Sequence, residues 1–291
     1  MNLFNQNIHM RIVFFFSMII IMLLPRTLSA QSDYTFNSLY RSFEEGKSFY
    51  VLKQSTIHAA PFSTAAILGE VSTGTVIRVE ERMDEIFKVK GFKTNWYRVV
   101  FENKGQLEEG YLWGGNIAIN AFQAKDNATI LFLYGVDHVG LVNRGNYEEE
   151  SIQLGLYVLE NKRVRDQVVF EAMGTLYTKT QGKSFGNKGL ETIQEIIEIA
   201  FSDGYCGGVA ATVTLFWDGE KLHYVNLLSS GFSTENFANR FYIYPQEHSE
   251  KEQTILLRKE LGTFDANKRP VYTEQVDTRY IWTDNGLQII P

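Results

Sequence analysis

The stretch Val209-Ala-Ala-Thr-Val-Thr-Leu-Phe-Trp217, followed by Asp218-Gly219-Glu220 and then Lys221-Leu-His-Tyr-Val-Asn-Leu-Leu228, decides the fold class. Both arms are rich in the β-branched and aromatic residues that favour strands. An Asp-Gly pair between two such runs is the strongest short-range signal of a β-hairpin, because glycine adopts the positive φ that a tight turn requires. This stretch therefore predicts a strand, a tight turn and an antiparallel return strand.

A related phrase, Tyr280-Ile-Trp-Thr-Asp-Asn-Gly-Leu287, closes the chain. It also places an aromatic residue and a tryptophan before a turn, with a leucine after it. Two copies indicate recurring hairpins but are too few to establish a propeller or solenoid. Further strands are expected at 129–134, 152–159, 168–172 and 195–202. Residues 191–202 also fit a helical face, but the alternation of residues 195–202 and the glycine-rich turn after them favour a strand. Residues 129–291 are therefore expected to form an antiparallel β domain, whose topology the sequence does not specify.

Residues 48–120 contain short runs of strand-forming residues separated by turn signals. The expected strands are 49–52, 75–80, 86–89, 96–101 and 110–113. Regularly spaced short strands of this kind indicate a sandwich or a barrel. The fold class predicted for the whole chain is therefore mainly β, with a small barrel followed by a larger antiparallel β domain.

Two segments flank this predicted barrel. Phe36, Leu39, Tyr40 and Phe43 recur at helical spacing, which predicts a lead-in helix within residues 31–47. Residues 121–128 are small and polar, which predicts a linker between the barrel and the C-terminal domain.

The pattern in residues 48–120 resembles the bacterial SH3-like (SH3b) domain. The resemblance rests on Pro61–Thr64, Ile67–Val71, Gly74–Val79, Trp96–Val99 and Gly110–Leu112. The chain departs from the family at Thr56–Pro61, which replaces the usual opening phrase, and in a longer insertion at residues 84–95. Members of that family bind peptides or peptidoglycan, so the resemblance implies a binding role.

Four aromatic residues of this segment are the candidate ligand contacts, namely Trp96, Tyr97, Tyr111 and Trp113. Aromatic rings of this kind line shallow peptide grooves. Because side chains alternate along a strand, the four cannot all face inward, and we expect one or two to be exposed and the others to fill the barrel core.

Residues 1–30 have the organisation of a cleavable secretory signal. Arg11 precedes an apolar run from Ile12 to Leu24, and small residues ending at Ala30 precede a polar stretch. A membrane anchor needs about 20 apolar residues, more than this run supplies. Since no cysteine follows the expected cut, a lipid anchor is excluded. We expect an exported protein, periplasmic or secreted, without a stable membrane anchor after cleavage.

The charge balance bears on the partners. The formal net charge of −6 becomes −8 once residues 1–30, with Arg11 and Arg26, are removed. An acidic excess argues against nucleic acid or anionic lipid as the main partner.

Cys206 is the only cysteine, which excludes an internal disulfide framework and a cysteine-rich zinc site. SH3-like domains often accompany cysteine peptidases of the cell wall, so Cys206 and His223 are the candidate nucleophile and base. Cys206 precedes a strand rather than a helix N-terminus, and residues 205–208 lack the Asp-Cys-Ser-Gly motif of that family. The scattered residues His58, His138 and His248 show no metal-binding spacing. No catalytic residue, metal or cofactor is therefore predicted.

Three functions remain open. The first is a non-catalytic envelope protein that binds a peptide or peptidoglycan through the SH3-like domain. The second is a cell-wall hydrolase that uses Cys206 and His223. The third is a structural role for the SH3-like unit, as a spacer for a partner-docking β domain.

Overall fold

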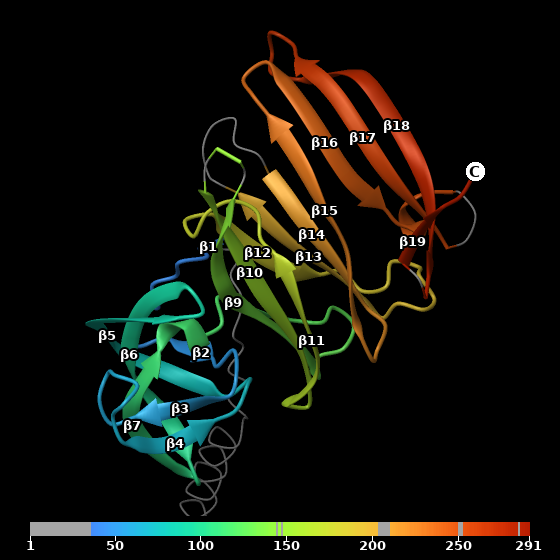
Figure 1. The fold of residues 1–291 in the computed structure, drawn as a ribbon. Helices are drawn as coiled ribbons and strands as arrows, with labels where there is room; N and C mark the ends of the chain where they lie inside the picture. The colour runs from blue at the N-terminus through green and yellow to red at the C-terminus, as the bar shows by residue number, and fades with distance from the viewer. Residues whose placement is uncertain (1–35, 144, 147, 203–209, 250–252, 285) are drawn as a thin grey trace, which may run out of the picture. The chain divides into compact units, whose positions relative to one another are not determined.

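The computed structural model describes residues 36–291, except 144, 147, 203–209, 250–252 and 285. Among these residues the strands form three sheets of six, four and nine strands, and every strand pair is antiparallel (Figure 1). The prediction of a mainly β chain is confirmed. The expected signal, residues 1–30, and Cys206 lie outside the described residues.

The six-stranded sheet curls into a half-barrel. Its strands, in the order β2-β5-β6-β7-β3-β4, are β2 (Ser48–Tyr50), β5 (Val76–Val89), β6 (Phe92–Asn103), β7 (Gln106–Trp113), β3 (Ser55–His58) and β4 (Ile67–Val71). The two strands expected at 75–80 and 86–89 are one long strand, β5, with register shifts that bend it. A Cβ at Gly110 would lie 2.3 Å from Cγ2 of Ile57, so the closing strand needs glycine there.

The four-stranded sheet has the order β11-β10-β9-β8. Its strands are β8 (Asn120–Gln123), β9 (Ile130–Asn143), β10 (Glu148–Glu160) and β11 (Arg163–Glu171). The prediction of a linker at 121–128 is therefore wrong, because β8 pairs with β9. The physical reason is burial: Phe122 and Ala124 are apolar side chains of the core beneath this sheet.

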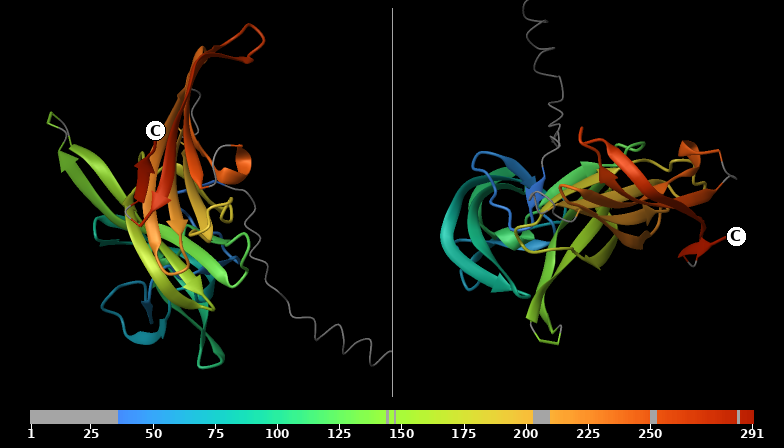
Figure 2. Two further views of the ribbon diagram at one scale, coloured as in Figure 1. Left: turned by 90° about the vertical axis from the view of Figure 1, so that its right-hand side faces the viewer. Right: turned by 90° about the horizontal axis from the view of Figure 1, so that it is seen from above.

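The nine-stranded sheet runs in near-sequential order. Its strands are β1 (Asn37–Ser38), β12 (Lys179–Ser184), β13 (Glu195–Ser202), β14 (Ala210–Trp217), β15 (Leu222–Phe232), β16 (Asn236–Ile243), β17 (Thr254–Phe264), β18 (Pro270–Thr283) and β19 (Gly286–Ile289). Both predicted hairpins are present, as β14–β15 and β18–β19 (Figures 1 and 2). Within the ambiguous segment 191–202, residues 195–202 form strand β13.

The predicted lead-in helix over residues 31–47 is wrong in its described part, residues 36–47. This segment contains no helix: β1 pairs with β12, and the Leu39 N–H donates to the Thr178 carbonyl at 3.0 Å. Leu39 is buried in a different core from Phe43. Apolar residues at helical spacing here reach two separate cores, which an extended backbone allows.

Three apolar clusters account for most of the buried side chains. The barrel core lies inside the half-barrel and includes Tyr97, Val99 and Phe101. The large core joins the four-stranded sheet to β13 and β14 and also contains Trp96 and Trp113 from the half-barrel. A third core, with Ile196, Phe216 and Tyr242 among its members, packs side chains from the other face of β13 and β14.

Strands β13 and β14 are thus buried on both faces. Ile197 and Ile199 belong to the large core, whereas Ile196 belongs to the third core. A strand covered on both sides carries apolar residues without strict alternation. This explains why residues 195–202 fit a helical as well as a β pattern. None of the described residues forms a helix with the length and apolarity that crossing a membrane requires.

Candidate ligand-binding pocket

The aromatic residues predicted to bind a ligand on the barrel lie mainly in the interior. Trp96, Tyr97 and Trp113 are 3%, 1% and 6% exposed. Tyr97 points into the barrel core, whereas Trp96 and Trp113 point the other way, into the large core. Tyr111 is half-buried and packs against the same large core. Side chains do alternate as expected, but the outward face is covered, so the structure brings these four residues into no open groove.

Polar contacts hold these rings in place. The Trp113 Nε1–H donates to the Phe87 carbonyl at 3.1 Å, and the Trp96 ring meets the His58 ring edge-on with centroids 5.4 Å apart. His58 itself is buried and lies 2.9 Å from the Thr56 hydroxyl. The aromatic residues of β6 and β7 therefore serve packing.

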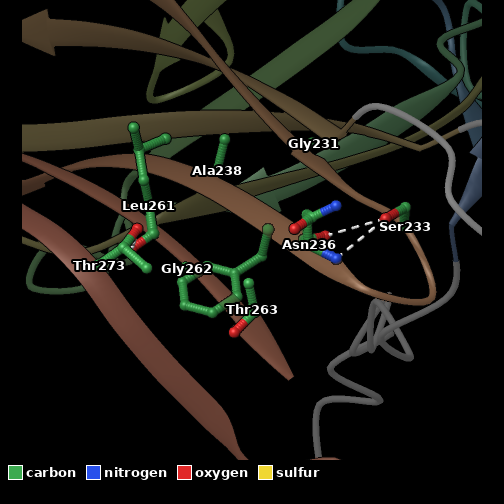
Figure 3. A pocket seen from close by; sticks show the side chains of 9 residues that line it. Gly231, Ser233, Asn236, Ala238, Leu261, Gly262, Thr263 and Thr273 are labelled. Carbon is green, nitrogen blue, oxygen red and sulfur yellow. Dashed lines mark hydrogen bonds between the residues drawn. The ribbon is translucent and has the colours of Figure 1, made fainter. Parts of the chain in front are cut away.

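A cavity of about 480 Å³, here called the upper cavity, lies over strands β15 to β18 (Figure 3). Its lining consists of Gly231, Ser233, Asn236, Phe237, Ala238, Leu261, Gly262, Thr263 and Thr273. At one end the Asn236 N–H donates to the Ser233 hydroxyl at 3.0 Å. This lining contains hydroxyl and amide groups but no acid, base or thiol, so it offers hydrogen bonds rather than acid–base catalysis.

A second cavity, of about 390 Å³, is lined by aromatic side chains from three strands and is here called the tyrosine pocket. Its lining consists of Tyr224, Val225 and Asn226 of β15, Tyr242 of β16, Tyr280 and Trp282 of β18, and Gly286 and Leu287 of β19. The sequence patterns missed the three tyrosines. They stand on strands far apart in sequence, and only the folded sheet brings them together.

Neighbouring aromatic rings support two of the rings that line the tyrosine pocket. Trp282 packs edge-on against Phe216, with centroids 4.9 Å apart, and against His223 at 5.4 Å. Tyr224 stacks on Phe170 at 6.3 Å and is still 45% exposed. These supports fix the direction of the aromatic walls, and rigid aromatic surface binds at low cost in conformational entropy.

Two phenols of the tyrosine pocket, those of Tyr224 and Tyr242, are neutral at neutral pH because their pKa values are raised. Burial raises the pKa of Tyr242, and a hydrogen bond with Asn226 opposes this in part. Burial also raises the pKa of Tyr224. The pocket therefore presents neutral hydroxyl and amide groups beside apolar ring faces, a combination that suits a polar ligand with apolar side groups.

The edge of β15 that borders the tyrosine pocket is open. Strand β15 pairs with β14 along most of its length but pairs with β16 only at Gly231 and Phe232. Beyond that point β16 diverges, and the Arg240 N–H donates to the Ser230 hydroxyl at 3.2 Å. In the described part of the chain, residues Leu222–Ser230 thus have a strand partner on one side only.

A smaller cavity of about 240 Å³ borders the same edge and is here called the arginine cavity. Its lining consists of Ser229, Ser230, Gly231, Ala238, Asn239, Arg240, Lys259 and Leu261. Lys259 Nζ lies 2.9 Å from Glu274 Oε1, whereas the exposed guanidinium of Arg240 makes no ion pair with any described residue. One end of the β15 edge is therefore cationic and the other end is neutral and aromatic.

His223 is engaged in the turn before it. Its Nε2 lies 2.6 Å from Asp218 Oδ2, and Asp218 Oδ1 accepts the backbone N–H groups of Glu220 and Lys221, each at 2.7 Å. Burial alone would raise the pKa of Asp218, but these hydrogen bonds outweigh it and hold the pKa below its usual range.

Of the candidate pair Cys206 and His223, only His223 lies within the described residues. Cys206 lies outside the described residues, and the chain leaves and re-enters the description at Ser202 and Ala210. His223 pairs with Phe216, six residues along β14 from Ala210, a separation of about 20 Å at roughly 3.3 Å per residue. His223 therefore lies at the end of the β14–β15 hairpin that holds the Asp218–Gly219 turn.

Metal chemistry also lacks a site within the described residues, where no group of three or more His, Cys, Asp or Glu side chains could hold an ion. An acid–base cluster near β13 is paired internally: Lys188 Nζ lies 2.9 Å from Glu247 Oε1 and over the Tyr244 ring at 4.9 Å. Burial raises the pKa of the neighbouring Glu198 against the pull of the Lys188 charge. This cluster joins β13 to the segment after β16.

No protein-family model, curated protein or solved structure matches this chain.

Proposed function

We propose that this chain is an exported, non-catalytic envelope protein that binds a peptide in the tyrosine pocket. The observation that carries the proposal is the convergence of Tyr224, Tyr280 and Trp282 around a cavity of about 390 Å³ beside an open strand edge. A peptide supplies both the apolar side chains that rings accept and the amide groups that neutral hydroxyls bind. The source is either a segment of a protein or the stem peptide of peptidoglycan.

In this proposal the SH3-like unit has a structural role. Its Trp96 and Trp113 contribute to the large core that β9, β10, β13 and β14 share. A ring that fills a core cannot contact a ligand. The burial of these two rings therefore favours a supporting role for the half-barrel, with the β domain as the part that docks a partner.

The proposal predicts that pocket variants lose binding while surface variants do not. The pocket variant is Tyr224→Ala combined with Tyr280→Phe, which removes one exposed ring and one hydroxyl. The matched control is Tyr177→Ala, since Tyr177 is 81% exposed and does not line this pocket. Binding is followed by tryptophan fluorescence, because Trp282 lines the cavity.

Three probes separate the sources of the peptide: a soluble stem tetrapeptide, insoluble purified cell wall, and a synthetic library of random linear octapeptides. We expect at least one probe to bind the wild type and the Tyr177 variant alike, and to bind the pocket variant about tenfold more weakly. Absence of binding by every probe, or equal binding by the pocket variant, would refute the proposal.

A further inference from the structure

We propose that the ligand is an extended segment of a protein that adds as a strand to the open edge of β15 and places a carboxylate against Arg240. This inference rests on the proposed function and assigns the ligand class and its orientation. In this inference, the place where β15 and β16 separate belongs to the same binding surface as the tyrosine pocket.

The first observation is the open edge itself. Strand β15 has β14 on one side, and on the other it is paired only at Gly231 and Phe232 in the described structure. An edge with free N–H and C=O groups is a template for another strand.

The sequence of this edge lacks the usual protection. Proteins blunt exposed edges with lysine, proline, inward charges or bulges. Residues 222–230 contain no Lys, Arg, Asp, Glu or Pro. One bulge occurs, where the register with β14 shifts around Val225, so the regular part of the edge is Asn226–Ser230. That part spans about 16 Å at roughly 3.3 Å per residue, enough for a strand of five residues.

The second observation is the pair of cavities along that edge. The tyrosine pocket borders it at Tyr224–Asn226, and the arginine cavity borders it at Ser229–Gly231. A strand laid along Asn226–Ser230 would therefore reach a cavity at each end. Alternate side chains of an added strand point to the same face, which is how such peptides fill pockets while their main chain supplies hydrogen bonds.

The third observation is the charge of the two ends. Arg240 is exposed and unpaired among the described residues, whereas Lys259 is neutralised by Glu274. A guanidinium binds a carboxylate with two parallel hydrogen bonds. The tyrosine pocket is neutral and aromatic. The ligand is thus expected to carry an Asp, a Glu or its C-terminal carboxylate at one end and an apolar or aromatic side chain at the other.

The test begins with octapeptides selected from a synthetic random library on the protein from Gln31 onward. The best binder is then made in two forms, each with N-methyl groups on one alternate set of backbone amides. Methylation removes N–H donors and leaves the side chains in place. Because one alternate set of amides faces β15, we expect one form to bind at least tenfold more weakly and the other to bind within about threefold of the parent.

Charge reversal tests the orientation. Arg240→Glu should weaken the carboxylate peptide at least tenfold and should affect its C-terminally amidated, acid-free version far less. Lys88→Glu makes the same change in net charge on an exposed residue of β5, and it should leave both peptides unaffected.

The outcomes separate this inference from the proposed function. If the peptide needs the tyrosine pocket but tolerates both methylated forms, strand addition is wrong and peptide binding stands. If only the stem tetrapeptide binds, the protein-segment ligand is wrong. If size-exclusion chromatography shows a dimer that the selected peptide cannot enter, a second copy occupies the edge and the inference is refuted. If no peptide binds at all, both proposals fail.

Discussion

Truncation of Trp113 to alanine should destabilise the whole described unit rather than the half-barrel alone. The side chain is 6% exposed, belongs to the large core, and donates its Nε1–H to the Phe87 carbonyl at 3.1 Å. A tryptophan buries about 200 Å², which at roughly 25 cal/mol per Å² corresponds to about 5 kcal/mol. Because the denatured chain already buries some of this surface and the cavity relaxes in part, we expect a loss of about 3–5 kcal/mol.

The assay is urea unfolding of the chain from Gln31 onward, followed by circular dichroism and by the fluorescence of the remaining tryptophans. Because Trp217 lies in the same large core, its emission should change in the same transition, shifted to lower urea. Trp113→Phe keeps most of the packing and should lose about 1–2 kcal/mol, including the hydrogen bond. A loss below about 1 kcal/mol for Trp113→Ala, or a separate early transition that leaves Trp217 emission unchanged, would refute a shared core.

Three further predictions concern stability. Gly110→Ala should cost about 1–3 kcal/mol in urea unfolding, because the new Cβ would meet Ile57; an unchanged midpoint would contradict this close approach. Burial raises the pKa of Tyr134 to about 12, so Tyr134→Phe should remove one of the phenols that ionise late in a spectrophotometric titration. The stability from Tyr134 should fall between about pH 10 and pH 12, because the unfolded chain ionises first. The lowered pKa of Asp218 stabilises the fold above about pH 4, and this stability should be lost as pH falls further. In Asp218→Asn the stability measured by urea unfolding should depend less on pH in this acid range. An unaltered pH dependence would argue against the His223 contact.

Much of the fold could be predicted from the sequence because strands and tight turns depend mainly on residues that are close together in the chain. The Asp218-Gly219 turn needs only its own residues and the strands on either side, and both predicted hairpins are present. The predicted helix failed because periodicity records which residues are apolar and not which core receives each one. Leu39 and Phe43 are buried in different cores, so their spacing in the sequence does not reflect a helix with one buried face.

The candidate site was harder to predict, for two physical reasons. A tryptophan on the outward face of a barrel strand is a plausible contact until the rest of the chain covers it, as happens to Trp96 and Trp113. The tyrosine pocket instead depends on contacts between distant parts of the chain: Tyr224, Tyr242 and Tyr280 belong to β15, β16 and β18 and line one cavity where β15 and β16 are no longer paired. Single-strand alternation contains no information about such an opening.

The pairing of β1 with β12 has a consequence for the order in which the protein assembles. Asn37 lies opposite Thr180, 143 residues further along the chain. A ribosome delivers the chain from its N-terminus, so β1 has no partner until β12 has emerged. Contacts of such high sequence separation slow folding, because the loop must close before the pairing stabilises it. During that interval the apolar side chains of Leu39 and Phe43 are exposed to other chains. The partly synthesised protein is therefore more prone to aggregate than the folded one.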